Sequence, residues 1–450
     1  MTKSFPDIRS KRLDLAEIDH NFQDLHEPLS RSEALIEADR CYFCFDAPCT
    51  TACPTGIDIP AFIQKIRSDN VRGSAHTILT ENIMGGMCAR VCPTEVLCEQ
   101  ACVRNTHEDK PVEIGLLQRY ATDPEFEETG RPRAPLFTRA KASGRKVAVV
   151  GAGPAGLSCA HRLAMLGHEV VVFNCDRKAG GLNEYGIAAY KTVDDFAQKE
   201  VEYILSIGGV EIRNGVSIGK ELSIDDLRQS YDAVFLGIGL ATVNELRIDG
   251  DDLPGVINAI DYIAELRQSK DRSALSVGGN IIVLGGGMTA IDIAVQSKRL
   301  GAPNVTIAYR RGPEQMGASR YEQQLAQTNG VLIRHWLQPK RMIGKQHVHA
   351  VDFAHTAIDQ AGKLVETGDI LRLEADVVFK AIGQALDATP LPSALTMSGG
   401  KLSVDEEFRT SLDGVWAGGD CVQGGDDLTV SAVQHGKLAA ISIDRRLRGT

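Results

Sequence analysis

The stretch Lys146-Val-Ala-Val-Val-Gly-Ala-Gly-Pro-Ala-Gly-Leu157 decides the fold of this 450-residue chain. It predicts a short buried strand, a glycine turn and the start of an apolar helix over 157–166, with another strand over 169–173. Glycines in such a βαβ unit let the backbone approach a pyrophosphate at a helix N-terminus. The sequence therefore predicts a dinucleotide-binding turn whose contacts are Gly151, Gly153, Pro154, Ala155 and Gly156.

The position about 20 residues beyond such a turn usually carries an acidic residue that binds a ribose hydroxyl. Asn174 occupies that position here, and Asp176 follows two residues later. An amide can still form a hydrogen bond with a ribose, but it carries no charge. Phosphate recognition is therefore predicted more strongly than adenosine recognition.

The same pattern returns in Gly285-Gly-Gly-Met-Thr-Ala290, between a predicted strand over 280–284 and a predicted helix over 291–300. A strand over 305–309 then leads into Arg310 and Arg311. Arginines can bind a 2′-phosphate through their forked donors, so this pair favours NADPH, although a solvated strand end is the alternative. The predicted contacts of this second dinucleotide site are Gly285, Gly287, Thr289, Ala290, Arg310 and Arg311.

Short strands that end in glycine recur at 233–239 and 377–383, and a further strand over 414–417 leads into Gly418-Gly-Asp420. A helix is expected from about Thr429. The region before residue 140 instead predicts helices, because a capping box at Ser30 and Glu33 precedes an apolar run and further helical patterns cover 59–66 and 75–79. Residues 130–144 have the composition of a linker.

Eight of the 11 cysteines lie between Cys41 and Cys102. They form two arrays with close spacing and Cys-Pro pairs, which are typical of [4Fe–4S] ligation. Zinc is the competing interpretation of such spacing, and a disulfide framework is disfavoured in a reducing compartment. The arrays are Cys41-x2-Cys44-x4-Cys49-x3-Cys53 and Cys88-x3-Cys92-x5-Cys98-x3-Cys102.

Charge and hydropathy patterning exclude several function classes. The net charge of −10 argues against sequence-independent binding of nucleic acid or of anionic membranes. No apolar run approaches the length of a membrane span, and residues 1–14 contain no apolar signal segment. We therefore expect a cytoplasmic protein that binds neither nucleic acid nor membranes.

Two dinucleotide motifs in one chain resemble the two-dinucleotide-binding flavoprotein family. The resemblance implies an α/β fold in which an N-terminal α-helical Fe–S domain precedes two Rossmann-like domains, the second inserted in the first. The implied segments are 1–141 (Fe–S), 142–243 and 381–450 (FAD) and 244–380 (NAD(P)H). It also implies dinucleotide or flavin contacts at Gly181, Leu182, Gly383, Gly419, Asp420 and Thr429. The isolated Cys159, Cys175 and Cys421 are interpreted as packing residues, so disulfide reduction is not expected.

The cysteine arrays narrow the resemblance to the electron-input part of dihydropyrimidine dehydrogenase and to the small subunit of bacterial glutamate synthase. Carried over from the first of these, one cluster would use Cys41, Cys44, Cys49 and Cys102. The other cluster would use Cys53, Cys92, Cys98 and Gln118, which leaves Cys88 without a role. Lys191 stands where the relative has an arginine near FAD. Gln118 favours the resemblance to dihydropyrimidine dehydrogenase (the pyrimidine branch), because the glutamate synthase subunit has an acidic residue at this position.

The resemblance implies that NAD(P)H reduces FAD, which passes electrons through two [4Fe–4S] clusters. A pyrimidine-reducing FMN barrel would need about 250 further residues, so a separate FMN/Fe–S subunit would reduce uracil or thymine. A glutamate synthase-like input subunit is the first alternative, and a non-enzymatic Fe–S scaffold is the second. The choice between NADH and NADPH, the direction of flux and the oligomeric state stay open.

Overall fold

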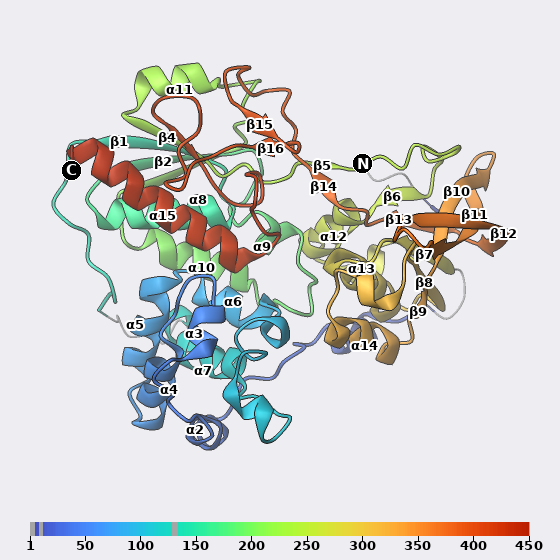
Figure 1. The fold of residues 1–450 in the computed structure, drawn as a ribbon, viewed down its shortest axis with the longest axis horizontal. Coiled ribbons are helices and arrows are strands. Elements are labelled where there is room, and N and C mark those ends of the chain that lie inside the picture. Colours follow the sequence, from blue (N-terminus) through green and yellow to red (C-terminus); the bar gives the residue numbers. More distant parts are fainter. Residues whose placement is uncertain (1–4, 9–11, 128–133, 450) are drawn as a thin grey trace. The chain divides into compact units, whose positions relative to one another are not determined.

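The computed structural model describes residues 5–8, 12–127 and 134–449 (Figure 1). The chain forms two compact units. The larger unit comprises His26–Glu184, Asp194–Thr242 and Ala385–Thr450. The smaller unit comprises Met1–Leu25, Tyr185–Val193 and Val243–Gln384.

The N-terminal part of the larger unit is helical, as predicted. Ser30 and Glu33 form the expected capping box, and the helical patterns over 59–66 and 75–79 both lie in helices. Buried side chains such as Phe62, Ile78 and Leu117 form its core. The helices are α2 (Arg31–Asp39), α3 (Pro48–Ala52), α4 (Ile59–Arg67), α5 (Val71–Glu81), α6 (Gly85–Val91) and α7 (Ile114–Phe126). The predicted linker lies partly outside the described residues, and residues 134–144 contain neither helix nor strand.

The rest of the larger unit is built on a five-stranded parallel sheet with the order β17-β4-β1-β2-β3. Its central strand is buried from Val147 to Val150, as expected for a parallel strand with both faces covered. The C-terminal strand β17 pairs with β4, so the last part of the chain completes a sheet that begins before the smaller unit. The strands are β1 (Lys146–Val150), β2 (Glu169–Asn174), β3 (Val210–Asn214), β4 (Ala233–Leu236) and β17 (Val415–Ala417).

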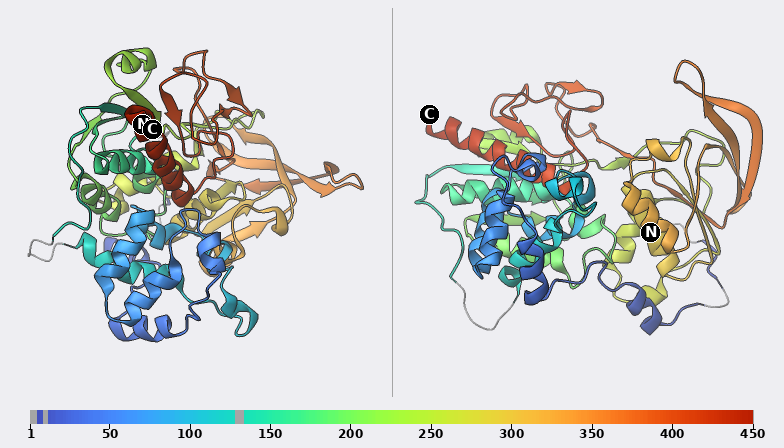
Figure 2. Two further views of the ribbon diagram at one scale, coloured as in Figure 1. Left: turned by 60° about the vertical axis from the view of Figure 1, so that its left-hand side comes forward. Right: turned by 60° about the horizontal axis from the view of Figure 1, so that its bottom comes forward.

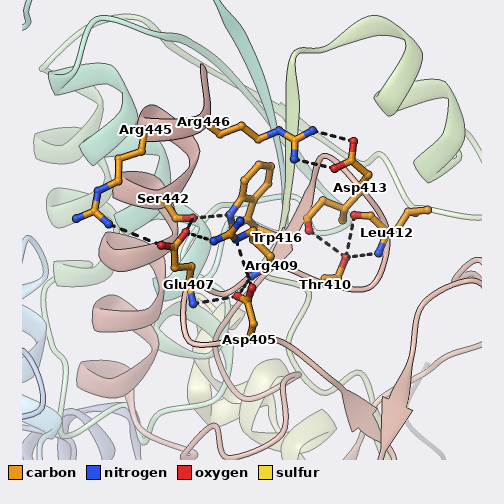
Figure 3. A network of polar contacts seen from close by, with 11 residues as sticks. Asp405, Glu407, Arg409, Thr410, Leu412, Asp413, Trp416, Ser442, Arg445 and Arg446 are labelled. Atoms are coloured by element: carbon orange, nitrogen blue, oxygen red, sulfur yellow. Dashed lines mark hydrogen bonds and ion pairs between the residues drawn. The ribbon is translucent and has the colours of Figure 1, made fainter. Parts of the chain in front are cut away.

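A polar network holds β17 against the C-terminal helix α15 (Thr429–Arg448) (Figure 3). Trp416 Nε1 donates to Ser442 Oγ at 3.0 Å, and Ser442 Oγ donates to Glu407 Oε2 at 3.1 Å. The Arg446 guanidinium binds both carboxylate oxygens of Asp413, at 2.7 and 2.8 Å. Strand and helix are therefore fixed together, with the predicted Gly419-Asp420 segment between them.

The smaller unit has its own parallel sheet, with the order β6-β13-β7-β8-β9, so the α/β fold with one dinucleotide-type domain inserted in another is confirmed. An antiparallel sheet that the sequence did not predict adds a long hairpin, β11–β12 (Figure 2). The strands are β6 (Val256–Asn258), β7 (Asn280–Leu284), β8 (Asn304–Ala308), β9 (Leu332–Arg334), β10 (Leu337–Gly344), β11 (Val348–Ile358), β12 (Leu364–Glu374) and β13 (Val377–Lys380). The main helices are α12 (Ala259–Gln268), α13 (Met288–Arg299) and α14 (Arg320–Thr328).

The N-terminal segment packs into the smaller unit. Phe5, Phe22 and Ile18 of helix α1 (Leu15–Asn21) are buried in its core. The Ile8 N–H donates to the Val277 carbonyl at 2.9 Å. Because the early sequence has no strand pattern and no cysteine, this packing was not predicted.

Candidate cofactor sites

The first glycine turn is packed so tightly that side chains are excluded at two of its three glycines. Gly151 has a φ of +96°, and a Cβ there would lie 2.2 Å from the Gly237 carbonyl oxygen. A Cβ at Gly156 would lie 1.9 Å from the Gly151 carbonyl oxygen. These two glycines are required by the fold itself.

Gly153 is different, because no atom of the described residues requires a glycine there. Its φ is −79°, and the nearest atom to a Cβ at this position would be the Gly181 Cα at 3.9 Å. Gly153 caps helix α8 (Pro154–Met165), whose first N–H groups have no partner within the helix. Open space at a helix N-terminus fits a pyrophosphate, whose charge the helix dipole stabilises.

Three segments that are distant in sequence meet at this turn. The Gly180 N–H donates to the Ala152 carbonyl at 2.8 Å, and a Cβ at Gly181 would lie 2.7 Å from Gly153 Cα. A Cβ at Gly419 would lie 3.2 Å from that of Ala155. The structure therefore brings the predicted contacts of the flavin loop and of the C-terminal segment to the N-terminus of α8.

The flavin loop continues into helix α9 (Leu182–Tyr185), which is tied to the start of α15. Thr429 Oγ1 donates to Asn183 Oδ1 at 2.7 Å. Nearby, burial is the main cause that raises the pKa of Asp420 to about 6, and the charge of Asp427 adds to it. A carboxyl group in this position can form hydrogen bonds with the hydroxyls of a ribityl chain.

Two residues expected near FAD are engaged elsewhere. Asn174 Nδ2 donates to the Lys178 carbonyl at 3.0 Å and to Asn214 Oδ1 at 2.9 Å, so its amide nitrogen holds a loop of the protein. Lys191 Nζ lies 2.7 Å from Asp292 Oδ1 and 3.2 Å from Glu322 Oε1 within the smaller unit. Burial opposes the charge of Lys191, but these carboxylates outweigh it and raise its pKa. A contact of either residue with FAD stays a prediction.

The second glycine turn repeats the design of the first. Gly285 has a φ of +140°, and a Cβ there would lie 2.1 Å from the Ala381 carbonyl oxygen. At Gly286 a Cβ would meet the Tyr309 ring at 2.6 Å, whereas a Cβ at Gly287 would have no atom of a described residue outside its chain neighbours within 4 Å. Gly287 caps α13, whose first turn carries Thr289 and the buried Ala290. The open position at Gly287 again fits a phosphate group.

Other predicted residues lie at the same edge of this sheet. Gly383 follows strand β13, which pairs in parallel with β7, so it emerges beside the turn. Arg310 is exposed and Arg311 is half-buried just after β8. Within the described parts of the chain neither guanidinium forms an ion pair, so both are available to an anionic group.

We expect Gly287→Ala to raise the KM for the nicotinamide dinucleotide about tenfold or more, because the new methyl group would occupy the space left for the phosphates. The backbone at Gly287 is extended, with a φ of −95°, so the fold tolerates alanine. Steady-state kinetics with an artificial electron acceptor measure the effect. FAD content should equal that of the wild type, and a loss of FAD would contradict separate sites.

The first cysteine set lines a single cavity. Its walls include all four predicted ligands, together with apolar side chains such as Ile59 and Val112, and its lining cysteines are Cys41, Cys44, Cys49 and Cys102. Burial is the main cause that raises the pKa of Cys49 to about 11. A thiolate in such an apolar wall needs a cationic partner, which iron supplies.

Three cysteines of the second predicted set also lie close to one another. The hydrogen bond between Cys92 and Cys88 is the main cause that raises the pKa of Cys92, and burial adds to it. The nearby thiols of Cys98 and Cys53 raise it further. Gln118 is buried on α7, and its Nε2 donates to the Gly85 carbonyl at 2.6 Å, which leaves the amide oxygen available as a ligand.

Cys88 had no predicted role, and the structure places it against Cys92, buried on α6. The predictions for the three isolated cysteines divide. Cys159 and Cys421 are buried packing residues, as expected. Cys175 is exposed directly after β2, so the prediction that it is a packing residue was wrong. No three His, Cys, Asp or Glu side chains in the described residues converge closely enough to hold a single metal ion.

Two family models match the chain. One, described as "Dihydroprymidine dehydrogenase domain II, 4Fe-4S cluster", matches residues 18–130. The other, described as "Pyridine nucleotide-disulphide oxidoreductase", matches residues 145–436. Together they indicate 4Fe–4S, FAD and NAD(P)H as the cofactors.

Full-length relatives agree with these matches. The chain is 34% identical to the "Glutamate synthase [NADPH] small chain" of Escherichia coli (strain K12), covering 94% of this chain and 93% of the relative. It is 33% identical to the "NAD-dependent dihydropyrimidine dehydrogenase subunit PreT" of Salmonella typhimurium, covering 92% and 94%.

Solved structures support the fold. "Mycobacterium tuberculosis FprA in complex with NADPH" matches with a TM-score of 0.57 and 19% identity, over 68% of this chain and 85% of that one. No helix in the described residues is long and apolar enough to cross a membrane. The chain therefore belongs to the pyridine nucleotide-disulphide oxidoreductase family, among the FAD- and NAD(P)H-dependent oxidoreductase subunits that carry an N-terminal 4Fe–4S domain.

Proposed function

We propose that this chain is the NAD(P)H-oxidising subunit of a dihydropyrimidine dehydrogenase. It would pass electrons through two [4Fe–4S] clusters to an FMN/Fe–S partner that reduces uracil or thymine to the 5,6-dihydropyrimidine. The observation that carries the proposal is the buried Gln118, whose Nε2 donates to the carbonyl of Gly85, the first residue of the helix that leads to Cys92. Dihydropyrimidine dehydrogenase has its glutamine ligand at this sequence position. The relationship to PreT supports the same partner.

The proposal assigns each cofactor to residues already described. FAD would bind at the first glycine turn, in the larger unit, and the nicotinamide dinucleotide at the second, in the smaller unit. The clusters would be held by Cys41, Cys44, Cys49 and Cys102, and by Cys53, Cys92, Cys98 and Gln118. A cytoplasmic location is part of the proposal.

When bound, FAD can accept two electrons from a nicotinamide and release them one at a time to one-electron clusters. The chain's own residues supply binding and orientation. Gly153 and Gly287 leave space for phosphates at two helix N-termini, and the half-buried Asp420 follows Gly419, which lies against Ala155 of the first turn. No side chain is needed as a general acid or base for hydride transfer.

An electron-input subunit for glutamate synthase is the second candidate, favoured by 34% identity to the Escherichia coli small chain. Co-purification separates the two candidates. An FMN protein of barrel size supports the first, whereas a large glutamine-hydrolysing chain supports the second.

Anaerobic purification with iron, sulfide and flavin analysis tests the cofactor content. We expect about eight iron atoms and one FAD per chain, because two [4Fe–4S] clusters hold four irons each. NAD(P)H should reduce an artificial acceptor through the purified protein. About four iron atoms would contradict the second cluster, zinc without sulfide would contradict both, and a colourless, inactive protein would favour the scaffold.

A further inference from the structure

Helix α15 carries two adjacent residues that face the two kinds of cofactor site in the larger unit. A Cβ at Gly436 would lie 2.1 Å from the Ala155 carbonyl oxygen, so the helix packs directly on the first glycine turn. The next residue, Lys437, is only 7% exposed although it carries a charge. A buried lysine is rare unless it is paired, so its contacts matter.

The Lys437 ammonium group binds two segments of the iron–sulfur region. Its Nζ donates to the Thr55 carbonyl at 3.2 Å, to the Glu81 carbonyl at 3.0 Å and to Glu81 Oε2 at 2.8 Å. Thr55 is buried, and its Oγ1 lies 3.3 Å from Cys53 Sγ. The ammonium is thus anchored to the loop that carries a ligand of the second cluster.

The charges of this ion pair are screened unequally. The Lys437 side chain is 9% exposed, whereas the Glu81 side chain is 41% exposed. Because water screens an exposed charge more than a buried one, the positive end dominates inside the protein. A net positive charge stabilises the extra electron of a reduced cluster, since charge and hydrogen bonding are among the terms that set its potential.

We propose that Lys437 is a positioning residue that raises the reduction potential of the cluster held by Cys53, Cys92, Cys98 and Gln118. This favours electron transfer from the flavin, whose glycine turn the same helix touches. The inference rests on the proposed function through that ligand set.

The test is a redox titration of the anaerobically purified full chain, followed by electron paramagnetic resonance. In Lys437→Gln the midpoint potential of this cluster should fall by about 59 mV, which corresponds to a tenfold change in the equilibrium constant of its one-electron reduction. In Glu81→Gln it should rise, because the buried ammonium loses its countercharge. Lys437→Arg keeps the charge and should restore the wild-type value.

Arg145→Gln is the matched control, since it removes a cation from the exposed pair with Asp232 in the same unit and should leave the midpoint unchanged. Opposite shifts in the two glutamine variants support the inference, because a purely structural defect would not reverse its sign. Equal midpoints, or shifts in one direction, would overturn it. If Lys437→Gln does not fold, the midpoint potentials of Glu81→Gln, expected to rise, and of Lys437→Arg, expected to stay at the wild-type value, still test the inference. A wild-type protein with one cluster would instead refute the proposed ligand set.

Discussion

Gly153→Ala is expected to weaken FAD binding at least about tenfold, equivalent to about 1.4 kcal/mol, while the fold stays intact. The nearest protein atom to the new methyl group would be 3.9 Å away, and the backbone conformation suits any residue. The methyl group would instead occupy the space into which a pyrophosphate must approach. Titration of the deflavinated protein with FAD measures the affinity, and thermal unfolding without FAD checks the fold.

Gly156→Ala is the matched control and should behave in the opposite way. Its methyl group would lie 1.9 Å from the Gly151 carbonyl oxygen, so the helix must move away from the strand. Overpacking of this kind lowers the free energy of unfolding by about 1–3 kcal/mol. Equal stability losses in the two variants would mean that Gly153 is also required by the fold, against its assignment to a phosphate site.

Cys49→Ala and Cys98→Ala are each expected to remove a different cluster, lowering the iron content from about eight to about four atoms per chain. Cys49 lines the cavity with Cys41, Cys44 and Cys102, whereas Cys98 lies with Cys53 and Cys92. Because each set is proposed to hold its own cluster, the two variants should lose different signals in electron paramagnetic resonance. Iron analysis and spectra of the reduced proteins measure both effects.

Cys88→Ala and Gln118→Leu identify the fourth ligand of the second set. Both residues are buried, Cys88 against Cys92 and Gln118 with its amide on the Gly85 carbonyl, but only Gln118 is proposed as a ligand. Cys88→Ala should therefore keep about eight iron atoms, whereas Gln118→Leu should lose about half. The reverse result would make Cys88 the ligand and would remove the observation that favours the pyrimidine branch.

Strands and turns that depend on neighbouring residues were predictable. Apolar runs followed by glycines placed β1 and β7 at the correct residues, because a parallel strand buried on both faces is apolar throughout. Strand β12 escaped prediction because most of its residues are exposed, so no apolar run or clean alternation marks it. A strand can therefore be predicted from its sequence when burial requires most of its residues to be apolar, and not when most of them face solvent.

Sequence alone determined that the chain has two dinucleotide turns and two cysteine arrays, because glycine and cysteine spacing carry that information within about 30 residues. Only the tertiary structure decided which glycine serves the fold and which leaves space for a ligand. Only the tertiary structure also showed that Cys88 lies against Cys92 and that Lys437 binds the loop that carries Cys53. These contacts join residues that spacing cannot relate, since packing between distant segments, rather than local pattern, sets where a buried charge or an open space lies.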